Sequence, residues 1–272
     1  MGLFRAKLAG RITKMGENTM ALELVTIPCL QDNYAYLLHD AGSGETAVVD
    51  VPDAAPILAE LARRNWHLTD ILLTHHHWDH IDGVPALVAA TGARVWGAAA
   101  DAHRLPPLDV ALAEGDSVQI GSETGNVLDV PGHTVGHIAF HFPEARLAFT
   151  ADSLMAMGCG RLFEGTPSQM WASLCKLAAL PGDTLICSGH EYTAANARFA
   201  ATLEPGNSAL TSRIAAITSA RAAGQATVPS LLSLELATNP FLRPAALKAA
   251  LGLPHATDAE IFAEIRARKD KF

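Results

Sequence analysis

A dense group of metal-ligand side chains stands at residues 74–80, which read Thr-His-His-His-Trp-Asp-His and follow a short apolar run typical of a buried strand. Imidazole and carboxylate groups bind zinc, iron and manganese. Beyond the strand, His75 and His77 can point the same way, and Asp79 and His80 begin the next turn. Four donors are too many for one catalytic metal with an open position, so the segment predicts two metals rather than a surface histidine cluster.

Three further segments pair a strand-like apolar run with a side chain that could bind metal. These runs lead to His133, Asp152 and His190. Each residue by itself could be an ordinary cap or turn residue. If the strands lie alongside the one before His75, their ends meet at one edge of a sheet, where loops are free to carry function. Because the pattern recurs, a single shared site is favoured.

The motifs in these segments also occur in an order that resembles a known family. They are THHHWDH at 74–80, PGHTVGH at 131–137, an aspartate after a strand at Asp152, and GHEYT at 189–193. This order resembles the metallo-β-lactamase-fold hydrolases, and within them it is most similar to glyoxalase II, the hydroxyacylglutathione hydrolases. Three later segments look like further glyoxalase II signatures: CGRLFEGT at 159–166, NPFLR at 239–243 and RARKDKF at 266–272. The first motif marks only the superfamily, whereas the later ones narrow the resemblance to glyoxalase II.

The resemblance covers residues 21–272 and implies an α/β fold. The expected architecture is the metallo-β-lactamase αββα four-layer sandwich with a smaller, mainly helical C-terminal domain. We expect a catalytic domain of this type at 21–189 and a helical, substrate-binding domain at 190–272. Strands that alternate with helices, followed by mainly helical patterns after Pro167, agree with a layered α/β protein.

The periodicity of apolar residues places the individual elements. Strands are expected at 22–27, 34–38, 47–50, 71–74, 94–96, 127–130, 137–142, 147–150 and 184–188. Helices are expected at 54–65, 84–91, 168–180, 193–203, 208–223 and 258–268. The last helix opens with Thr257-Asp258-Ala259-Glu260, the pattern of a capping box.

Residues 1–20 form an extension that precedes the family pattern. It carries four basic residues against the single acid Glu17, and it lacks the apolar segment of 7 to 15 residues that a signal peptide needs. A weak targeting sequence, a disordered tail and a start assigned too early are the alternatives. We favour the last two, because Met15 and Met20 both offer later starts.

The resemblance implies a role for each metal-ligand side chain. The family's first metal site falls on His75, His77 and His133, its second on Asp79, His80 and His190, and Asp152 would bridge both metals. Two divalent cations that share one water depress its pKa toward ~7, the value for a single zinc. Hydroxide is then available at neutral pH, and Asp79 would also orient it. Zinc is the first choice, although iron and manganese accept the same donors.

The spacer residues of the first motif are expected to take no part in metal binding. His76 should face away from the site, and Trp78 should pack against the protein.

The resemblance also implies a set of residues that bind glutathione: Arg161, Phe163, Tyr192, Arg266 and Lys269. A glutathione thioester is a net anion, so it needs local cations on a chain whose net charge is −8. Arg266 and Lys269 stand three apart on the last expected helix and therefore project from one face. A basic last turn also compensates the helix dipole, and only the family resemblance favours a binding role. Some family members carry tyrosine at Phe163, so a hydroxyl contact there is absent.

The expected activity is hydrolysis of the thioester of S-(2-hydroxyacyl)glutathione by a metal-bridging hydroxide. The chief reaction would convert (S)-lactoylglutathione to D-lactate and glutathione, the second step of methylglyoxal detoxification. The glutathione thiolate, from a thiol of pKa ~8.5, leaves without a dedicated acid. The alternatives are a lactonase, a β-lactamase or a single-iron persulfide dioxygenase of the same fold, a metal-dependent nuclease, and a metal-binding protein without catalytic activity.

Composition narrows the class of protein and its surroundings. At 272 residues and 49% hydrophobic, the chain can bury a large core in one to two domains. No stretch reaches the ~18 apolar residues of a membrane span. The four cysteines form no CxxC pair, which indicates a reducing compartment, and we expect the cytoplasm. The charge of −8 argues against nucleic-acid binding. We expect a monomer whose partner is the small-molecule thioester.

Overall fold

The computed structural model describes residues 22–272, so the expected extension at 1–20 lies outside the described residues. Two six-stranded sheets form the centre of the molecule. The first has the order β1 (Leu22–Cys29), β2 (Asn33–Asp40), β3 (Thr46–Val49), β4 (Asp70–Leu72), β5 (Arg94–Ala98) and β6 (Val110–Leu112). The second has the order β14 (Ser230–Leu231), β13 (Leu185–Ser188), β10 (Leu147–Ala151), β9 (Ile138–Phe142), β8 (Glu123–Asp129) and β7 (Ser117–Ile120). A separate two-stranded hairpin joins β11 (Leu154–Met155) to β12 (Gly158–Cys159).

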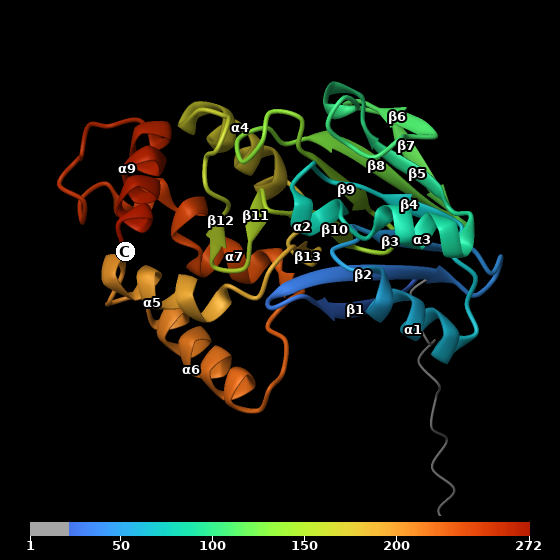
Figure 1. Cartoon of the computed structure of the whole chain (residues 1–272). Helices are drawn as coiled ribbons and strands as arrows, with labels where there is room; N and C mark the ends of the chain where they lie inside the picture. The colour runs from blue at the N-terminus through green and yellow to red at the C-terminus, as the bar shows by residue number, and fades with distance from the viewer. Residues whose placement is uncertain (1–21) are drawn as a thin grey trace, which may run out of the picture.

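Helices cover the outer faces of both sheets (Figure 1). Those of the first half of the chain are α1 (Ala54–Arg64), α2 (Trp78–Ile81), α3 (Val84–Thr91) and the 3-10 turn η1 (Ala99–Asp101). Those that follow are α4 (Pro167–Ala178), α5 (Thr193–Leu203), α6 (Ser208–Ala222), α7 (Leu232–Thr238), η2 (Pro240–Leu242), α8 (Pro244–Leu247) and α9 (Asp258–Asp270). No helix among these is long and apolar enough to cross a membrane.

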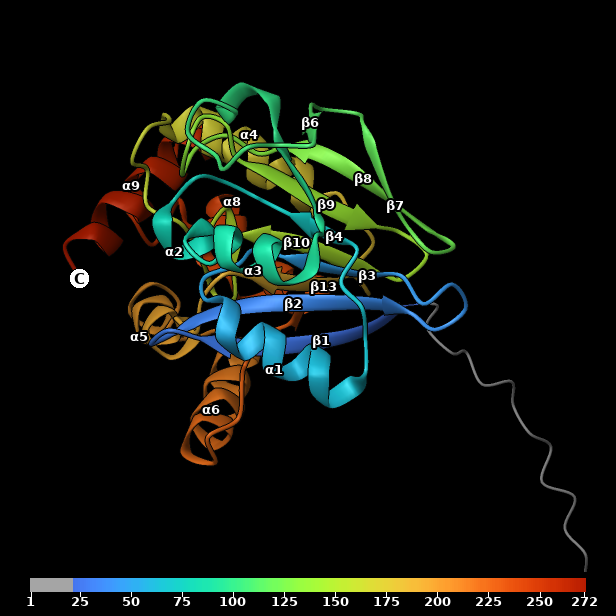
Figure 2. The ribbon, with the colours of Figure 1, turned by 45° about the vertical axis from the view of Figure 1, so that its right-hand side comes forward.

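Three apolar layers hold the sandwich together. The two sheets bury Phe140 and Phe149, with the residues around them, between their facing sides. Helices α1 and α3 pack on the outside of the first sheet around Ile57 and Ile71, and Figure 2 shows them on that face. On the outside of the second sheet, α4 and α9 bury a third cluster that includes Phe262. The α/β fold with four layers in the order αββα is therefore confirmed.

The expected strands and helices are present, with ends shifted by a few residues. The capping box at the start of α9 is present as well, with Thr257 and Glu260 exchanging hydrogen bonds. The segment after residue 190 is mainly helical, but it also adds strand β14 to the second sheet. Its helices share the apolar cluster of the second sheet, so this segment and the sandwich bury one continuous surface.

Strand direction explains why the metal-ligand segments converge. In the first sheet β3, β4 and β5 run parallel, and in the second β8, β10 and β13 share one direction. The segments that carry His75, His133, Asp152 and His190 each follow the end of one of these strands. Backbone hydrogen bonds from Ile138 to Thr74, and between the segments of Asn33 and His190, join the two sheets at this edge. The four segments therefore lie close together at one edge of the two sheets.

Candidate metal centre and substrate pocket

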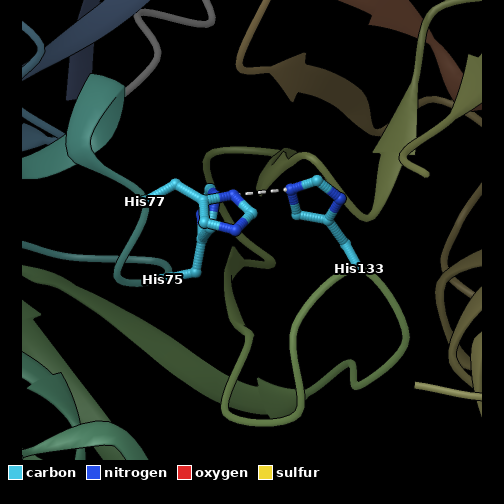
Figure 3. Close-up of side chains that lie close together, drawn as sticks. All are labelled: His75, His77 and His133. Atoms are coloured by element: carbon cyan, nitrogen blue, oxygen red, sulfur yellow. Dashed lines mark hydrogen bonds between the residues drawn. The ribbon is translucent and has the colours of Figure 1, made fainter. Parts of the chain in front are cut away.

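The first group of ligand atoms comes from three histidines. Nδ1 of His77 lies 3.2 Å from Nε2 of His75 and 3.0 Å from Nε2 of His133. Figure 3 shows a ring nitrogen of His77 directed at a ring nitrogen of His133, with His75 beside His77. His75 is fully buried and His133 nearly so. The turn after β4 and the loop after β8 therefore place three imidazoles around a space of the size that one metal ion needs.

A second group lies next to the first and consists of Asp79, His80 and His190, whose ligand atoms lie within 4.8 Å of one another. Asp152 stands between the two groups. Its Oδ2 lies 3.3 Å from Nε2 of His190 and 3.4 Å from Nε2 of His133, and its Oδ1 lies 3.6 Å from Nε2 of His80. The structure thus brings together all seven residues that the sequence predicted as ligands.

The hydrogen-bond partners of two histidine rings indicate that the site can bind cations. Nδ1 of His80 lies 2.8 Å from a carboxylate oxygen of Asp50, and Nδ1 of His190 lies 3.0 Å from one of Asp32. Because carboxylates accept, each Nδ1 donates, and Nε2 of each neutral ring carries no proton. These two Nε2 atoms face one another at 3.3 Å, and the buried Oδ1 of Asp152 has no hydrogen-bond partner. When both rings are neutral, their lone pairs converge on one space and suit a dinuclear site of divalent cations.

The charges around the site favour a positive ion. Burial lowers the pKa of His190, but the Asp152, Asp32 and Asp79 carboxylates outweigh burial and raise that pKa to about 9. At neutral pH the ring therefore also holds a proton on Nε2, and a bound cation would take the place of that proton. Burial opposes ionisation of Asp152, yet His190, His80 and His133 hold the pKa of its carboxyl well below the usual range. Asp152 is therefore a carboxylate at neutral pH.

Three residues that support the ligands carry no ligand motif, and the sequence analysis missed them. Asp50 accepts hydrogen bonds from Thr74 and from the His80 ring, and Asp32 orients the His190 ring. Asn33 donates its amide to the backbone oxygen of Asp79 at 2.9 Å and to its carboxylate at 3.1 Å. The one available signal was positional, because Asp50 follows the end of a strand as the predicted ligands do.

Replacing Asp32 with alanine should weaken binding of one of the two metals by about 10- to 100-fold, because the carboxylate fixes the tautomer and direction of the His190 ring. Metal titration against a competing chelator measures this affinity. Asp82→Ala is the matched control, since within residues 22–272 Asp82 makes no hydrogen bond to these histidines. Equal weakening in both variants would assign the effect to net charge rather than to orientation of His190.

A pocket with a volume of about 660 Å³ opens over this site. Its wall includes the five residues predicted to bind glutathione, namely Arg161, Phe163, Tyr192, Arg266 and Lys269. Trp78 also lines the pocket and is 64% exposed, so the expectation that it packs against the protein was wrong. It is the first residue of the short helix α2. His76 takes neither ligand nor pocket position and instead hydrogen-bonds Asp101 at 3.0 Å.

Aromatic side chains frame the metal-ligand residues. The Tyr192 ring stacks on the His190 ring with centroids 4.7 Å apart, and burial together with nearby carboxylates raises the pKa of its hydroxyl to about 12. Phe163 places its ring edge-to-face against His133 and His77, at 5.3 and 5.6 Å. Both aromatic residues are partly exposed, and together they form an apolar rim around the polar site.

The two cations of α9 differ in their partners. Arg266 is 5% exposed, and its guanidinium donates to the backbone oxygen of Cys159 at 3.0 Å and to Asp270. Lys269 has no acidic partner within residues 22–272, and burial together with Arg266, Arg198 and Arg161 lowers the pKa of its amine. Arg161 likewise has no side-chain partner in the described part of the chain. Lys269 and Arg161 are thus the cations available to an anionic ligand.

Two family models together match residues 30–272. The model described as the metallo-beta-lactamase superfamily matches residues 30–190, and the one described as the hydroxyacylglutathione hydrolase C-terminus matches residues 191–272. A hydroxyacylglutathione hydrolase of Cereibacter sphaeroides is 73% identical over 93% of this chain and the whole of that protein.

Solved structures share the fold. The B3 metallo-beta-lactamase BLEG-1 is 23% identical, with a TM-score of 0.64 over 81% of this chain and all of that chain. The protein TTHA1623, solved in a di-iron-bound form, is 30% identical, with a TM-score of 0.57 over 81% of this chain and all of that chain. From its motifs, its αββα sandwich and these relatives, the chain belongs to the hydroxyacylglutathione hydrolases, the glyoxalase II family of the metallo-β-lactamase superfamily.

Proposed function

We propose that this protein hydrolyses the thioester of S-(2-hydroxyacyl)glutathione, and chiefly converts (S)-lactoylglutathione to D-lactate and glutathione. The observation that carries the proposal is the pocket itself. It joins two groups of metal-ligand side chains to two cations without acidic partners, Arg161 and Lys269. The name of the Cereibacter sphaeroides relative supports the same substrate class. We also propose that the protein acts in the cytoplasm and that it is a monomer.

The proposed metal roles follow the two groups of side chains. His75, His77 and His133 would hold one divalent cation, Asp79, His80 and His190 the other, and Asp152 both. When bound, such cations supply Lewis acidity and lower the pKa of a water between them toward ~7. Zinc is our first choice, and the di-iron form of TTHA1623 makes iron the main alternative.

The protein side chains then have separate tasks. Asp79, held by the amide of Asn33, would orient the attacking water and accept a hydrogen bond from it. Asp152 balances the positive charge of the site. The leaving glutathione thiolate, from a thiol of pKa ~8.5, needs no acid from the protein.

The helical segment 190–272 and the 160–166 loop would bind the glutathione part. Lys269 and Arg161 would pair with its carboxylates. Tyr192 would contact the peptide, and Phe163 would close the pocket beside His133. Arg266 lines the same wall and would also contact the glutathione part, while its contacts with Cys159 and Asp270 fix the direction of its guanidinium.

Assay of the purified protein with a panel of substrates tests the proposal. Thioester hydrolysis is followed by the loss of lactoylglutathione absorbance, and metal content is measured in the same sample. Parallel assays use a lactone, a β-lactam and glutathione persulfide. Turnover of the lactone or the β-lactam without turnover of lactoylglutathione would overturn the proposal. One iron per chain with oxygen uptake on persulfide would identify a dioxygenase instead.

Replacing Lys269 with alanine should raise KM for lactoylglutathione by about 10- to 100-fold and change kcat far less, because a hydrogen bond to a charged group contributes about 1.5–3 kcal/mol. Lys271→Ala is the matched control, since it removes the same charge two residues later from a side chain outside the pocket. Steady-state kinetics at two salt concentrations separate the contact from general attraction, which salt screens. An unchanged KM would remove Lys269 from the binding site.

A further inference from the structure

The β11–β12 hairpin connects the metal centre to the substrate pocket. It begins two residues after Asp152 and ends two residues before Arg161, whose backbone oxygen accepts a hydrogen bond from the His133 ring at 2.8 Å. Gly160 lies so close to Asp152 that an added Cβ would stand 2.0 Å from the Asp152 backbone oxygen. The position of the hairpin therefore affects Asp152, His133 and Arg161 together.

This hairpin is too short to hold its own shape. Its strands pair through only Leu154 with Cys159 and Met155 with Gly158, and two-stranded hairpins are marginally stable in water. Met157 at its tip and Ala151 before Asp152 have positive φ angles of 61° and 38°, a region unfavourable for residues with a side chain. Such a conformation persists only where surrounding groups hold it.

Side chains of the C-terminal helices supply that support. The amide of Asn239, just after α7, donates to the backbone oxygens of Met155 at 3.1 Å and Gly158 at 3.0 Å. Asn196 of α5 donates to the backbone oxygen of Ala156 at 3.1 Å. Asn239 therefore bridges both strands of the hairpin, although it is fully buried and does not line the pocket.

A buried carboxylate fixes Asn239 in turn. Glu235, one turn earlier on α7, accepts hydrogen bonds from the Asn239 amide at 3.1 Å and from the Met157 backbone at 2.8 Å. Glu235 is fully buried and pairs with Arg213 of α6. Because each donor of the Asn239 amide has a partner, the side chain has a single orientation, and the hairpin is held from the helical side of the molecule.

We propose that Asn239 is a positioning residue for the metal centre, which acts through the β11–β12 hairpin to hold Asp152 between the two ligand groups. The inference rests on the proposed role of Asp152 as a shared metal ligand. Without the amide, two buried carbonyls lose their donors, and the hairpin is free to shift together with the Asp152 backbone that it contacts. The effect should therefore appear in metal binding before any substrate is added.

Cobalt binding by the Asn239→Ala protein tests the proposal. Stripped of metal and titrated with Co²⁺ against a chelator, the variant should bind at least one equivalent about 10-fold more weakly, as loss of partners around metal ligands commonly causes. The visible absorption of bound Co²⁺, which reports ligand geometry, should change in intensity. Asn239→Ser keeps one hydroxyl donor, so its affinity for Co²⁺ should lie between those of the wild type and the alanine variant. This second variant preserves the test if Asn239→Ala folds poorly.

Asn207→Ala is the matched control. Asn207 caps α6 and donates its amide to the backbone oxygen of Ala237 at 3.2 Å, so its loss weakens the same helical region without touching the hairpin. Both variants should melt at lower temperature, but only the Asn239 variants should alter the cobalt spectrum. An unchanged spectrum and affinity in Asn239→Ala, or an equal change in Asn207→Ala, would overturn the proposal. Because these measurements need no substrate, inactivity of the wild-type protein toward lactoylglutathione would refute the proposed function separately.

Discussion

Replacement of Asp152 by asparagine is expected to lower kcat for lactoylglutathione by roughly 10²- to 10³-fold, the scale on which loss of one preorganised electrostatic group acts. Asp152 lies within 3.6 Å of His133 in the first ligand group and of His80 and His190 in the second, and it is 6% exposed. Asparagine preserves its size, but it removes the negative charge and turns an amide donor toward ligand atoms. Steady-state kinetics, with metal content determined by mass spectrometry on the same sample, measure both consequences.

Asp70→Asn serves as the control for this prediction. Asp70 is also buried and begins β4, at the end of the strand away from His75, where it accepts a hydrogen bond from Trp96 at 2.7 Å. Its loss should reduce stability but leave kcat close to the wild-type value. If Asp152→Asn retained full kcat and two metals per chain, Asp152 would have no role as a shared ligand.

Replacing Glu235 with alanine should lower the free energy of unfolding by about 3–5 kcal/mol, the usual cost of leaving one member of a buried ion pair without its partner. Glu235 is fully buried and Arg213 is 5% exposed, so water does not compensate the guanidinium charge. Ser230 and the Met157 backbone would lose their acceptor at the same time. Denaturant unfolding followed by circular dichroism measures the change.

Two further variants identify the cause of this loss. In the double variant Glu235→Leu with Arg213→Met both charges are gone, so a large part of the stability should return. Glu264→Ala breaks the exposed pair with Arg268 in α9 and should stay within about 0.5 kcal/mol of wild type. A double variant no more stable than Glu235→Ala would show that the hydrogen bonds to Ser230 and Met157, rather than the unpaired charge, dominate.

The sequence alone predicted the layered fold because the longer elements repeat their apolar residues with a clear period. The strands that became β8, β9 and β10, and helices such as α1 and α6, extend over enough residues to show it. By contrast, β11, β12 and β14 contain two residues each, which is too short for any alternation. They exist because of pairing with distant segments, and for that reason the sequence analysis did not predict them.

The sequence also predicted which residues would come together at the candidate metal site, because their residue types and spacing are typical of metal ligands. His75, His77, Asp79 and His80 lie in one short segment, and each further predicted ligand follows the end of a strand. Since strands that run in one direction end at one edge, the pattern was sufficient to expect a single site. It was also sufficient to suggest the family, which the similar proteins then showed.

The tertiary structure decided which groups support the ligands and which side chains are free for substrate. Asp32 orients His190 from 158 positions away, and Arg266 donates to Cys159 from 107 positions away. A hydrogen bond between such distant residues leaves no periodic pattern in the chain. Nor does any sequence pattern indicate that Trp78 is exposed or that Asn239 donates hydrogen bonds to the β11–β12 hairpin. The sequence thus determined the chemistry of the candidate ligands. Long-range packing determined their orientation, because each supporting residue lies on a different segment of the chain from the ligand that it holds.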